Sequence, residues 1–213
     1  MSVKPLITYP NDRKNLCKAI SGMLPKGRHT ILSPFFGGGT VETSLAKDGH
    51  SIIGYIHYRR LYDFWNSTLI DPERLYKLAQ HFYPIENEKI FHNFQEMQDI
   101  PDDSHMRAAL FFVLNKSTKN GLVSCGKLVC LPPPYKSDSA LQPHPPPEIP
   151  VVDHEKLKKL LGEQKFWLVA YKYCEEVEAL YSGYTKIYLD VSGRKTVDVK
   201  KAKDIIFTNI KGK

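Results

Sequence analysis

The sequence predicts an α/β fold with a mostly parallel sheet and an antiparallel hairpin that closes it at the C-terminal end. Short apolar runs typical of buried strands alternate with segments whose apolar residues recur at helical spacing. A glycine-rich turn over 33–39 stands between a short strand and a helix, an order that opens many nucleotide-binding α/β folds. A chain of 213 residues fits one domain over 1–213 with a sizeable core.

The first half of the chain alternates helix and strand signals. Leu16, Ile20 and Leu24 recur at helical spacing within 11–24, and Pro25 ends that helix. Strands are expected over 30–32 and 51–55, with a helix over 41–47 between them. Further helices are expected over 59–69, 72–82 and 103–115, and we interpret 59–125 as a reduced helical insertion.

A proline-rich linker divides the chain. Eight of the fifteen prolines lie between Pro132 and Pro150, and proline supplies no backbone N–H for a helix or a central strand. We therefore expect 132–150 to be extended or looped. After it the pattern predicts a helix over 153–161, a strand over 166–170, a helix over 174–181 and an antiparallel strand pair over 186–191 and 204–210.

The composition excludes several classes of protein. The 42% hydrophobic content is that of a globular chain, and no apolar run approaches the roughly 18 to 20 residues of a membrane span. Four cysteines do not suggest a disulfide scaffold in a chain of this size, and Cys125 and Cys130 lack the paired ligands of a zinc site. We expect a soluble, intracellular protein without a metal ion or a membrane partner.

Positive charge is concentrated at the C-terminal end. Residues 194–213 carry a net charge of +5, out of +7 for the whole chain. A basic surface attracts the phosphate backbone of nucleic acids without sequence preference. The alternative, a solvated lysine-rich edge that keeps the hairpin soluble, fits the charge equally well. The candidate nucleic-acid-binding residues are Arg194, Lys195, Lys200, Lys201 and Lys203.

The glycine turn also carries a resemblance. The run Pro34-Phe35-Phe36-Gly37-Gly38-Gly39-Thr40-Val41-Glu42 resembles the first motif of the Dam-like (D12 class) DNA adenine-N6 methyltransferases, whose loop binds S-adenosylmethionine. Further segments resemble the family in its order, among them Tyr9-Pro10, Gly54-Tyr55, 108–115, 120–122, 153–157, 166–171 and 205–209. The resemblance implies a Rossmann-like methyltransferase fold. It also implies vestigial cofactor-binding positions at Tyr9, Pro10, Phe35, Phe36, Gly37, Gly38 and Gly39.

The positions that would contact the cofactor depart from the family. Its opening turn has two glycines where this chain has Asn11 and Asp12, and its first motif has an acid where this chain has Ser33. The family's second strand ends in an Asp that accepts hydrogen bonds from both ribose hydroxyls. Here Ile56 stands at that position, and His57 is expected to point to the opposite side of the strand.

The catalytic motif departs as well. The family has Asp-Pro-Pro-Tyr, whose acid and first proline carbonyl accept hydrogen bonds from the adenine amino group while the tyrosine stacks on the flipped base. The nearest match here is Pro132-Pro133-Pro134-Tyr135, with Pro132 in place of the acid. In a second alignment, 126–129 matches a segment that precedes this motif, and the motif itself is deleted. In either case we expect no catalytic residue and no cofactor, with S-adenosylmethionine only if the chain is active.

Three functions fit this pattern. The first is a catalytically inactive methyltransferase-like protein that acts as a nucleic-acid-binding or assembly subunit, with DNA favoured over RNA. The second is an active DNA adenine-N6 methyltransferase or a related DNA-modifying enzyme. The third is a repurposed structural component of a viral or organellar assembly, for which 132–150 would serve as a spacer or contact strand. Basic and aromatic residues within 59–100 could also bind nucleic acid, although aromatic residues at helical spacing more often belong to a core.

Overall fold

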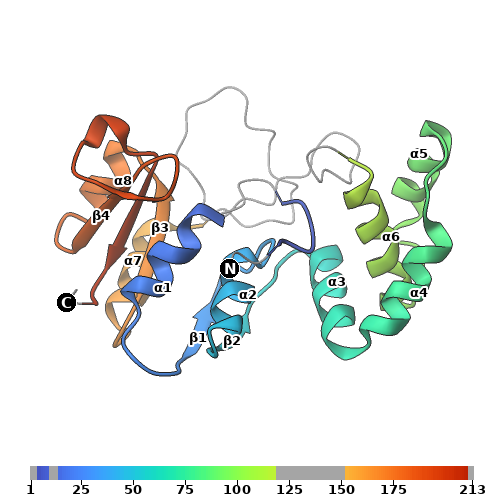
Figure 1. The fold of residues 1–213 in the computed structure, drawn as a ribbon, viewed down its shortest axis with the longest axis horizontal. Coiled ribbons are helices and arrows are strands. Elements are labelled where there is room, and N and C mark those ends of the chain that lie inside the picture. The colour runs from blue at the N-terminus through green and yellow to red at the C-terminus, as the bar shows by residue number, and fades with distance from the viewer. Residues whose placement is uncertain (1–3, 10–13, 119–151, 211–213) are drawn as a thin grey trace.

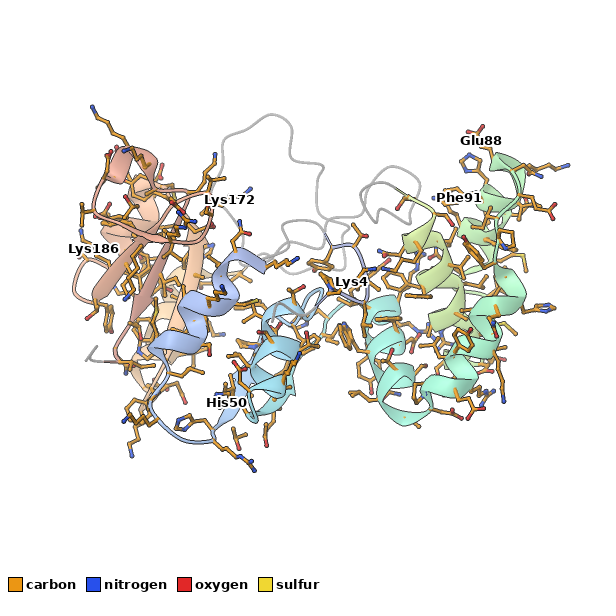
Figure 2. All side chains as sticks on the ribbon, viewed as in Figure 1. Lys4, His50, Glu88, Phe91, Lys172 and Lys186 are labelled. Carbon is orange, nitrogen blue, oxygen red and sulfur yellow. The ribbon has the colours of Figure 1, made fainter. Side chains whose placement is uncertain are left out.

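The computed structural model describes residues 4–9, 14–118 and 152–210. Figure 1 shows an elongated molecule with an antiparallel sheet at one end, a parallel strand pair in the middle and a group of helices at the other end. Figure 2 places Lys186 at the sheet end and Glu88 and Phe91 at the far helical end. In the described part of the chain, no helix is long and apolar enough to cross a membrane.

The parallel pair carries the glycine turn. Strand β1 (Thr30–Ser33) pairs with β2 (Ser51–Gly54) in parallel, and helix α2 (Thr40–Lys47) connects them. Ile31 and Ile52 are Cα partners, and both pack against the core cluster that contains Leu45 of α2. The expected unit of two adjacent parallel strands joined by a helix is confirmed.

The second sheet has four strands in the order β3-β6-β4-β5. All of its pairings are antiparallel, so the expected pairing of the last two long strands, β4 with β6, is confirmed. The expectation of a mostly parallel sheet is wrong for the described residues. Strands β3 and β4 do run in the same direction, but β6 lies between them and opposes both. The strands are β3 (Leu168–Lys172), β4 (Thr185–Leu189), β5 (Lys195–Thr196) and β6 (Asp204–Thr208).

Both faces of this second sheet are buried. Along β6, Ile205 and Phe207 pack into one core cluster with Val177 of α8, whereas Ile206 packs into another with Leu16 and Ile20. Alternate side chains of a strand point to opposite faces, so helices must cover both sides. The helices on the first side are α7 (His154–Gly162) and α8 (Glu175–Leu180), and η1 (Lys14–Leu16) and α1 (Cys17–Met23) lie on the second.

The helical end, which we call the helical insertion (residues 59–116), is organised around α6 (Ser104–Lys116). This helix is buried almost all round, which explains why its apolar residues do not follow a single stripe. Side-chain caps fix three helix starts, because Asp71 accepts from the Arg74 backbone N–H at 2.9 Å, Asn87 from that of Ile90 at 3.0 Å and Asp103 from that of His105 at 2.9 Å. The neighbouring helices are α3 (Arg59–Ile70), α4 (Pro72–Phe82) and α5 (Glu88–Met97), and the sequence did not predict α5.

The N-terminal segment is tied to this insertion. The Thr8 N–H donates to Asn115 Oδ1 at 2.8 Å, and Asn115 Nδ2 donates back to the Thr8 carbonyl at 2.8 Å. Ile7 is buried in the core cluster of the helices. These contacts hold the adjacent Tyr9 over the glycine turn.

Candidate functional site

The glycine turn joins the carboxyl ends of the parallel strands. The Tyr55 N–H donates to the Ser33 carbonyl at 2.9 Å, and the Phe36 N–H donates to the Tyr55 carbonyl at 3.1 Å. Gly39 has a φ of +71° and directly precedes α2, a left-handed conformation that favours glycine. The turn therefore has the position that ligand-binding loops occupy in open α/β folds.

Aromatic side chains pack directly on this turn. A Cβ atom placed on Gly37 would lie 2.7 Å from Tyr9 Cε1, and one on Gly38 would lie 2.6 Å from Tyr9 Cβ. At Gly39 the nearest atom would be Trp65 Cζ2 at 2.4 Å, and Trp65 Nε1 donates to the Gly37 carbonyl at 3.3 Å. The three glycines are thus required for close packing of Tyr9 and Trp65, so their presence alone does not demand a small-molecule ligand.

Apolar packing continues to the end of β2. Phe36 lies edge-on to Trp65 with ring centroids 5.2 Å apart, and a Cβ atom on Gly54 would lie 2.3 Å from Phe36 Cδ2. Ile56, which stands where the family has its ribose-binding acid, packs against the core cluster of the helical insertion. His57 is exposed. The structure therefore gives Ile56 a packing role.

A carboxylate that the sequence interpretation missed lies beside Ser33. The Ser33 hydroxyl donates to Glu42 Oε1 at 2.7 Å, so the first turn of α2 brings an acid to the strand end where the family's own acid is absent. Burial raises the pKa of the Glu42 carboxyl. A carboxylate here can accept hydrogen bonds or face a cationic group. The sequence feature that could have identified Glu42 is its place in the first turn of the helix that follows the glycines.

The second candidate site is the connection from β4 to β6, which we call the basic hairpin (residues 190–203). Its first turn is held by Asp190, whose Oδ1 accepts from the Ser192 N–H at 2.8 Å and the Arg194 N–H at 2.9 Å. Among the described residues, Lys201 has an ion pair, with Asp198 at 3.6 Å, and the other candidates have none. All five are exposed: Arg194, Lys195, Lys200, Lys201 and Lys203.

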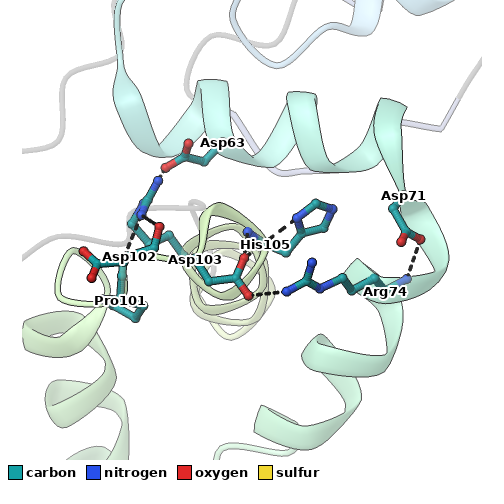
Figure 3. Close-up of polar contacts among 8 residues, drawn as sticks. Asp63, Asp71, Arg74, Pro101, Asp102, Asp103 and His105 are labelled. Carbon is teal, nitrogen blue, oxygen red and sulfur yellow. Dashed lines mark hydrogen bonds and ion pairs between the residues drawn. The ribbon is translucent and has the colours of Figure 1, made fainter.

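Four basic residues of the helical insertion, in contrast, are paired with acids, namely Arg60, Arg74, Lys77 and Arg107, whereas Arg59, Lys89 and Lys116 are exposed without an ion pair among the described residues. Arg107 Nε donates to Asp63 Oδ2 at 2.7 Å, and both side chains are at most 7% exposed. The same guanidinium donates to the carbonyls of Pro101 at 2.6 Å and Asp102 at 2.9 Å (Figure 3). The Asp63 carboxylate raises the pKa of Arg107. This cluster fixes the chain at the start of α6.

Two further pairs neutralise arginines in the insertion. Arg74 contacts Asp103 at 2.6 Å (Figure 3), and Arg60 Nε donates to Asp99 Oδ1 at 2.8 Å. The hydrogen bond from Arg60 lowers the pKa of Asp99. Trp65 and Phe82 pack in the core, whereas Tyr76 and Tyr83 are exposed, so helix packing accounts for part of the aromatic pattern in this segment.

Several candidate positions lie outside the described residues. They are Pro10, Asn11, Asp12, Cys125, Cys130 and the segment Pro132 to Tyr135. Of the described cysteines, Cys17 and Cys174, neither is in a disulfide bond. In the parts of the chain that the structure covers, no three His, Cys, Asp or Glu side chains are grouped as metal ligands would be.

A glycine turn between a parallel strand and a helix, followed by a group of helices, fits a methyltransferase-like α/β domain. The family model for D12 class N6 adenine-specific DNA methyltransferase matches residues 13–129. The chain belongs to this family, whose members use S-adenosylmethionine to modify DNA. A comparison with curated proteins finds no match. The matched residues include the glycine turn and the helical insertion, whereas the antiparallel sheet and the basic hairpin lie beyond them.

Proposed function

We propose that this chain is a catalytically inactive methyltransferase-like protein that acts as a nucleic-acid-binding subunit, with DNA as its partner. The observation that carries the proposal is the apolar packing at the cofactor positions. Ile56 packs against the core, and Tyr9 and Trp65 lie against the glycine turn. The vestigial positions serve the fold, because aromatic rings fill the space that the glycines leave.

Energetics support the loss of cofactor binding. Isoleucine offers no hydrogen-bond acceptor, so ribose hydroxyls buried beside Ile56 would lose their partners at about 1–3 kcal/mol each. The losses at Asn11, Asp12 and Ser33 add to this at separate points of the family's site. Several absent contacts in one site disfavour binding more than any single substitution does.

DNA binding rests on the exposed basic hairpin and on the family's substrate. Replacing Lys200, Lys201 and Lys203 with Gln should weaken binding to unrelated DNA sequences alike, because phosphate contacts carry no sequence information. Each lost contact should reduce the slope of log affinity against log salt by about 0.7 to 0.9. Fluorescence anisotropy with labelled duplex DNA at several salt concentrations tests this. An unchanged slope in the triple variant, or no binding by the parent protein at low salt, would refute it.

One observation favours an active enzyme as a second candidate. Glu42 supplies a carboxylate beside Ser33. The folded protein therefore has an acid next to the position where the family's first motif has one, although the residue at that position is Ser33. An active DNA adenine-N6 methyltransferase would bind S-adenosylmethionine and transfer its methyl group. Transfer of a radiolabelled methyl group to mixed-sequence DNA would support this candidate over the inactive subunit.

Exposed apolar side chains favour a third candidate, a structural subunit of a larger assembly such as a viral or organellar particle. Leu32 and Ile53 are partners across β1 and β2, and they are 57% and 49% exposed. Apolar residues that adjoin on a sheet face are typical of a surface that another molecule covers. A Leu32→Asp variant that remains folded and loses its place in an isolated native complex would support this candidate.

A further inference from the structure

We infer that the phosphate-binding surface extends from the basic hairpin onto η1 and the start of α1, so that Lys14 and Lys18 join Arg194 and Lys195 in one surface for the nucleic-acid backbone. This inference rests on the proposed nucleic-acid-binding function and adds residues that lie more than 170 positions away in the sequence. The observation behind it is the direct contact between the turn of the basic hairpin and the segment that contains Asn15.

The hairpin turn lies directly on η1, which immediately precedes α1. Asn15 Nδ2 donates to the Val191 carbonyl at 2.7 Å. Gly193 has a φ of +73°, and a Cβ atom there would lie only 2.0 Å from the Asn15 carbonyl oxygen. A glycine is required at 193 both for this conformation and for this contact. In Figure 1 the start of α1 accordingly lies beside the loop that follows β4.

The turn is also rigid before any partner binds. Asp190 Oδ1 caps two backbone N–H groups, the Asp190 N–H donates to the Arg194 carbonyl at 2.9 Å, and the Gly193 N–H donates to the Asp190 carbonyl at 2.9 Å. Arg194 is therefore held next to the helix start. A turn whose backbone is already ordered loses little backbone freedom when it binds a partner, which favours affinity.

The positive charges of this surface are not paired with acids within the described residues. Lys14, Lys18, Arg194 and Lys195 are all exposed, and none has an ion pair there. The nearest acid of the turn, Asp190, is engaged by backbone N–H groups. Like charges on segments that contact each other repel, and a polyanion reduces that repulsion. A phosphate backbone provides regularly spaced negative charge, and it is the polyanion that DNA-modifying proteins contact.

Paired substitutions test the inference by fluorescence anisotropy with a labelled duplex DNA of mixed sequence at several salt concentrations. K14Q/K18Q and R194Q/K195Q should each lower the slope of log affinity against log salt by up to about 1.8, or about 0.9 for each lost contact. The matched control is K156Q/K159Q, which removes two exposed lysines from α7 on the opposite face of the antiparallel sheet. This control should leave the slope unchanged.

A third variant tests the contact between the hairpin turn and Asn15. Gly193→Ala leaves every charge in place but displaces the turn from Asn15, so it should weaken DNA binding while circular dichroism shows retained helix and sheet. If this variant aggregates, Asn15→Ala, which removes only the hydrogen bond to Val191, replaces it, and the same weakening is expected. An unchanged affinity in the variant that stays soluble would overturn the inference.

The outcomes separate this inference from the proposed function. If R194Q/K195Q lowers the slope and K14Q/K18Q does not, the extension onto α1 is wrong while the hairpin function stands. If the parent protein binds no DNA at low salt, both fail. If polyglutamate competes as well as unlabelled DNA at equal charge concentration, an acidic protein is the better partner and the nucleic-acid assignment of this surface is overturned.

Discussion

The helical insertion and the basic hairpin use their positive charges differently. In the insertion, Arg107 is buried against Asp63, and Arg60 and Arg74 contact acids as well. In the hairpin, among the described residues, the basic side chains are exposed and one of the candidates, Lys201, has an ion pair. Charge that is paired with an acid inside a fold is already engaged, whereas charge left in solvent is available to a partner molecule. Composition alone does not distinguish the two.

The two regions also differ in their relation to the family. The insertion lies within the residues that the family model matches, and the hairpin lies beyond them. The described cofactor positions within the match are packed with aromatic and aliphatic side chains. We therefore assign the first region to stability and the second to binding, and each prediction below tests that division.

The largest expected effect is on the buried ion pair. Arg107→Ala should lower the free energy of unfolding by about 3–5 kcal/mol, because it leaves the Asp63 carboxylate buried without its partner. Urea denaturation followed by circular dichroism measures this. Lys77→Ala, which removes an exposed partner of Glu73, is the control and should change stability by less than about 0.5 kcal/mol. A loss below about 1 kcal/mol for Arg107→Ala would contradict a structural role for the pair.

A smaller effect is expected for the partly exposed pairs. R60Q/R74Q should lower stability by about 0.2–1 kcal/mol for each pair, since solvent screens such interactions. The same variant should leave the salt dependence of DNA binding unchanged. Fluorescence anisotropy compares this variant with the K200Q/K201Q/K203Q variant. If the slope of log affinity against log salt falls equally in both, the two regions do not differ in DNA binding as proposed.

The smallest effect concerns Glu42. Burial raises the pKa of this carboxyl in the folded protein, so the folded state holds its proton to higher pH than the unfolded state does. The contribution of Glu42 to the free energy of unfolding is fully present below its pKa in the unfolded state. It is lost as pH rises through its pKa in the folded state. Glu42→Gln keeps an acceptor for the Ser33 hydroxyl but has no proton to lose, so stability no longer falls with pH at this position. The variant should therefore gain stability relative to the parent protein as pH rises. Denaturation curves across this pH range test it, and a parallel pH dependence in both proteins would refute it.

Local signals predicted much of the fold from the sequence. The start of α4 at Pro72 after Asp71 follows from capping and from the preference for proline in the first helical turn. The parallel pair β1 and β2 followed from two short apolar runs separated by a helix. Strand β3 begins at Leu168, two residues later than expected, and the preceding Trp167 N–H donates to the Asn209 side chain at 2.8 Å.

Non-local contacts could not be predicted in this way. The insertion of β6 between β3 and β4 decides that the second sheet is antiparallel, and nothing within β6 itself specifies its neighbours. The approach of Glu42 to Ser33 and of Asn15 to Val191 likewise depends on tertiary packing. Arg194 and the candidate lysines of the hairpin were evident from charge, but only the structure shows that, among the described residues, Lys201 has an ion pair and the other candidates have none.

Calorimetric titration with S-adenosylmethionine tests most directly the central claim, that the chain keeps the family's framework without its cofactor chemistry. The claim is based on four positions that differ from the family's cofactor-binding residues: Asn11, Asp12, Ser33 and Ile56. We predict no binding heat at micromolar cofactor concentrations for a protein whose fold is verified by circular dichroism. A dissociation constant in the low micromolar range would contradict the claim and favour the active methyltransferase, with Glu42 as the replacement acid.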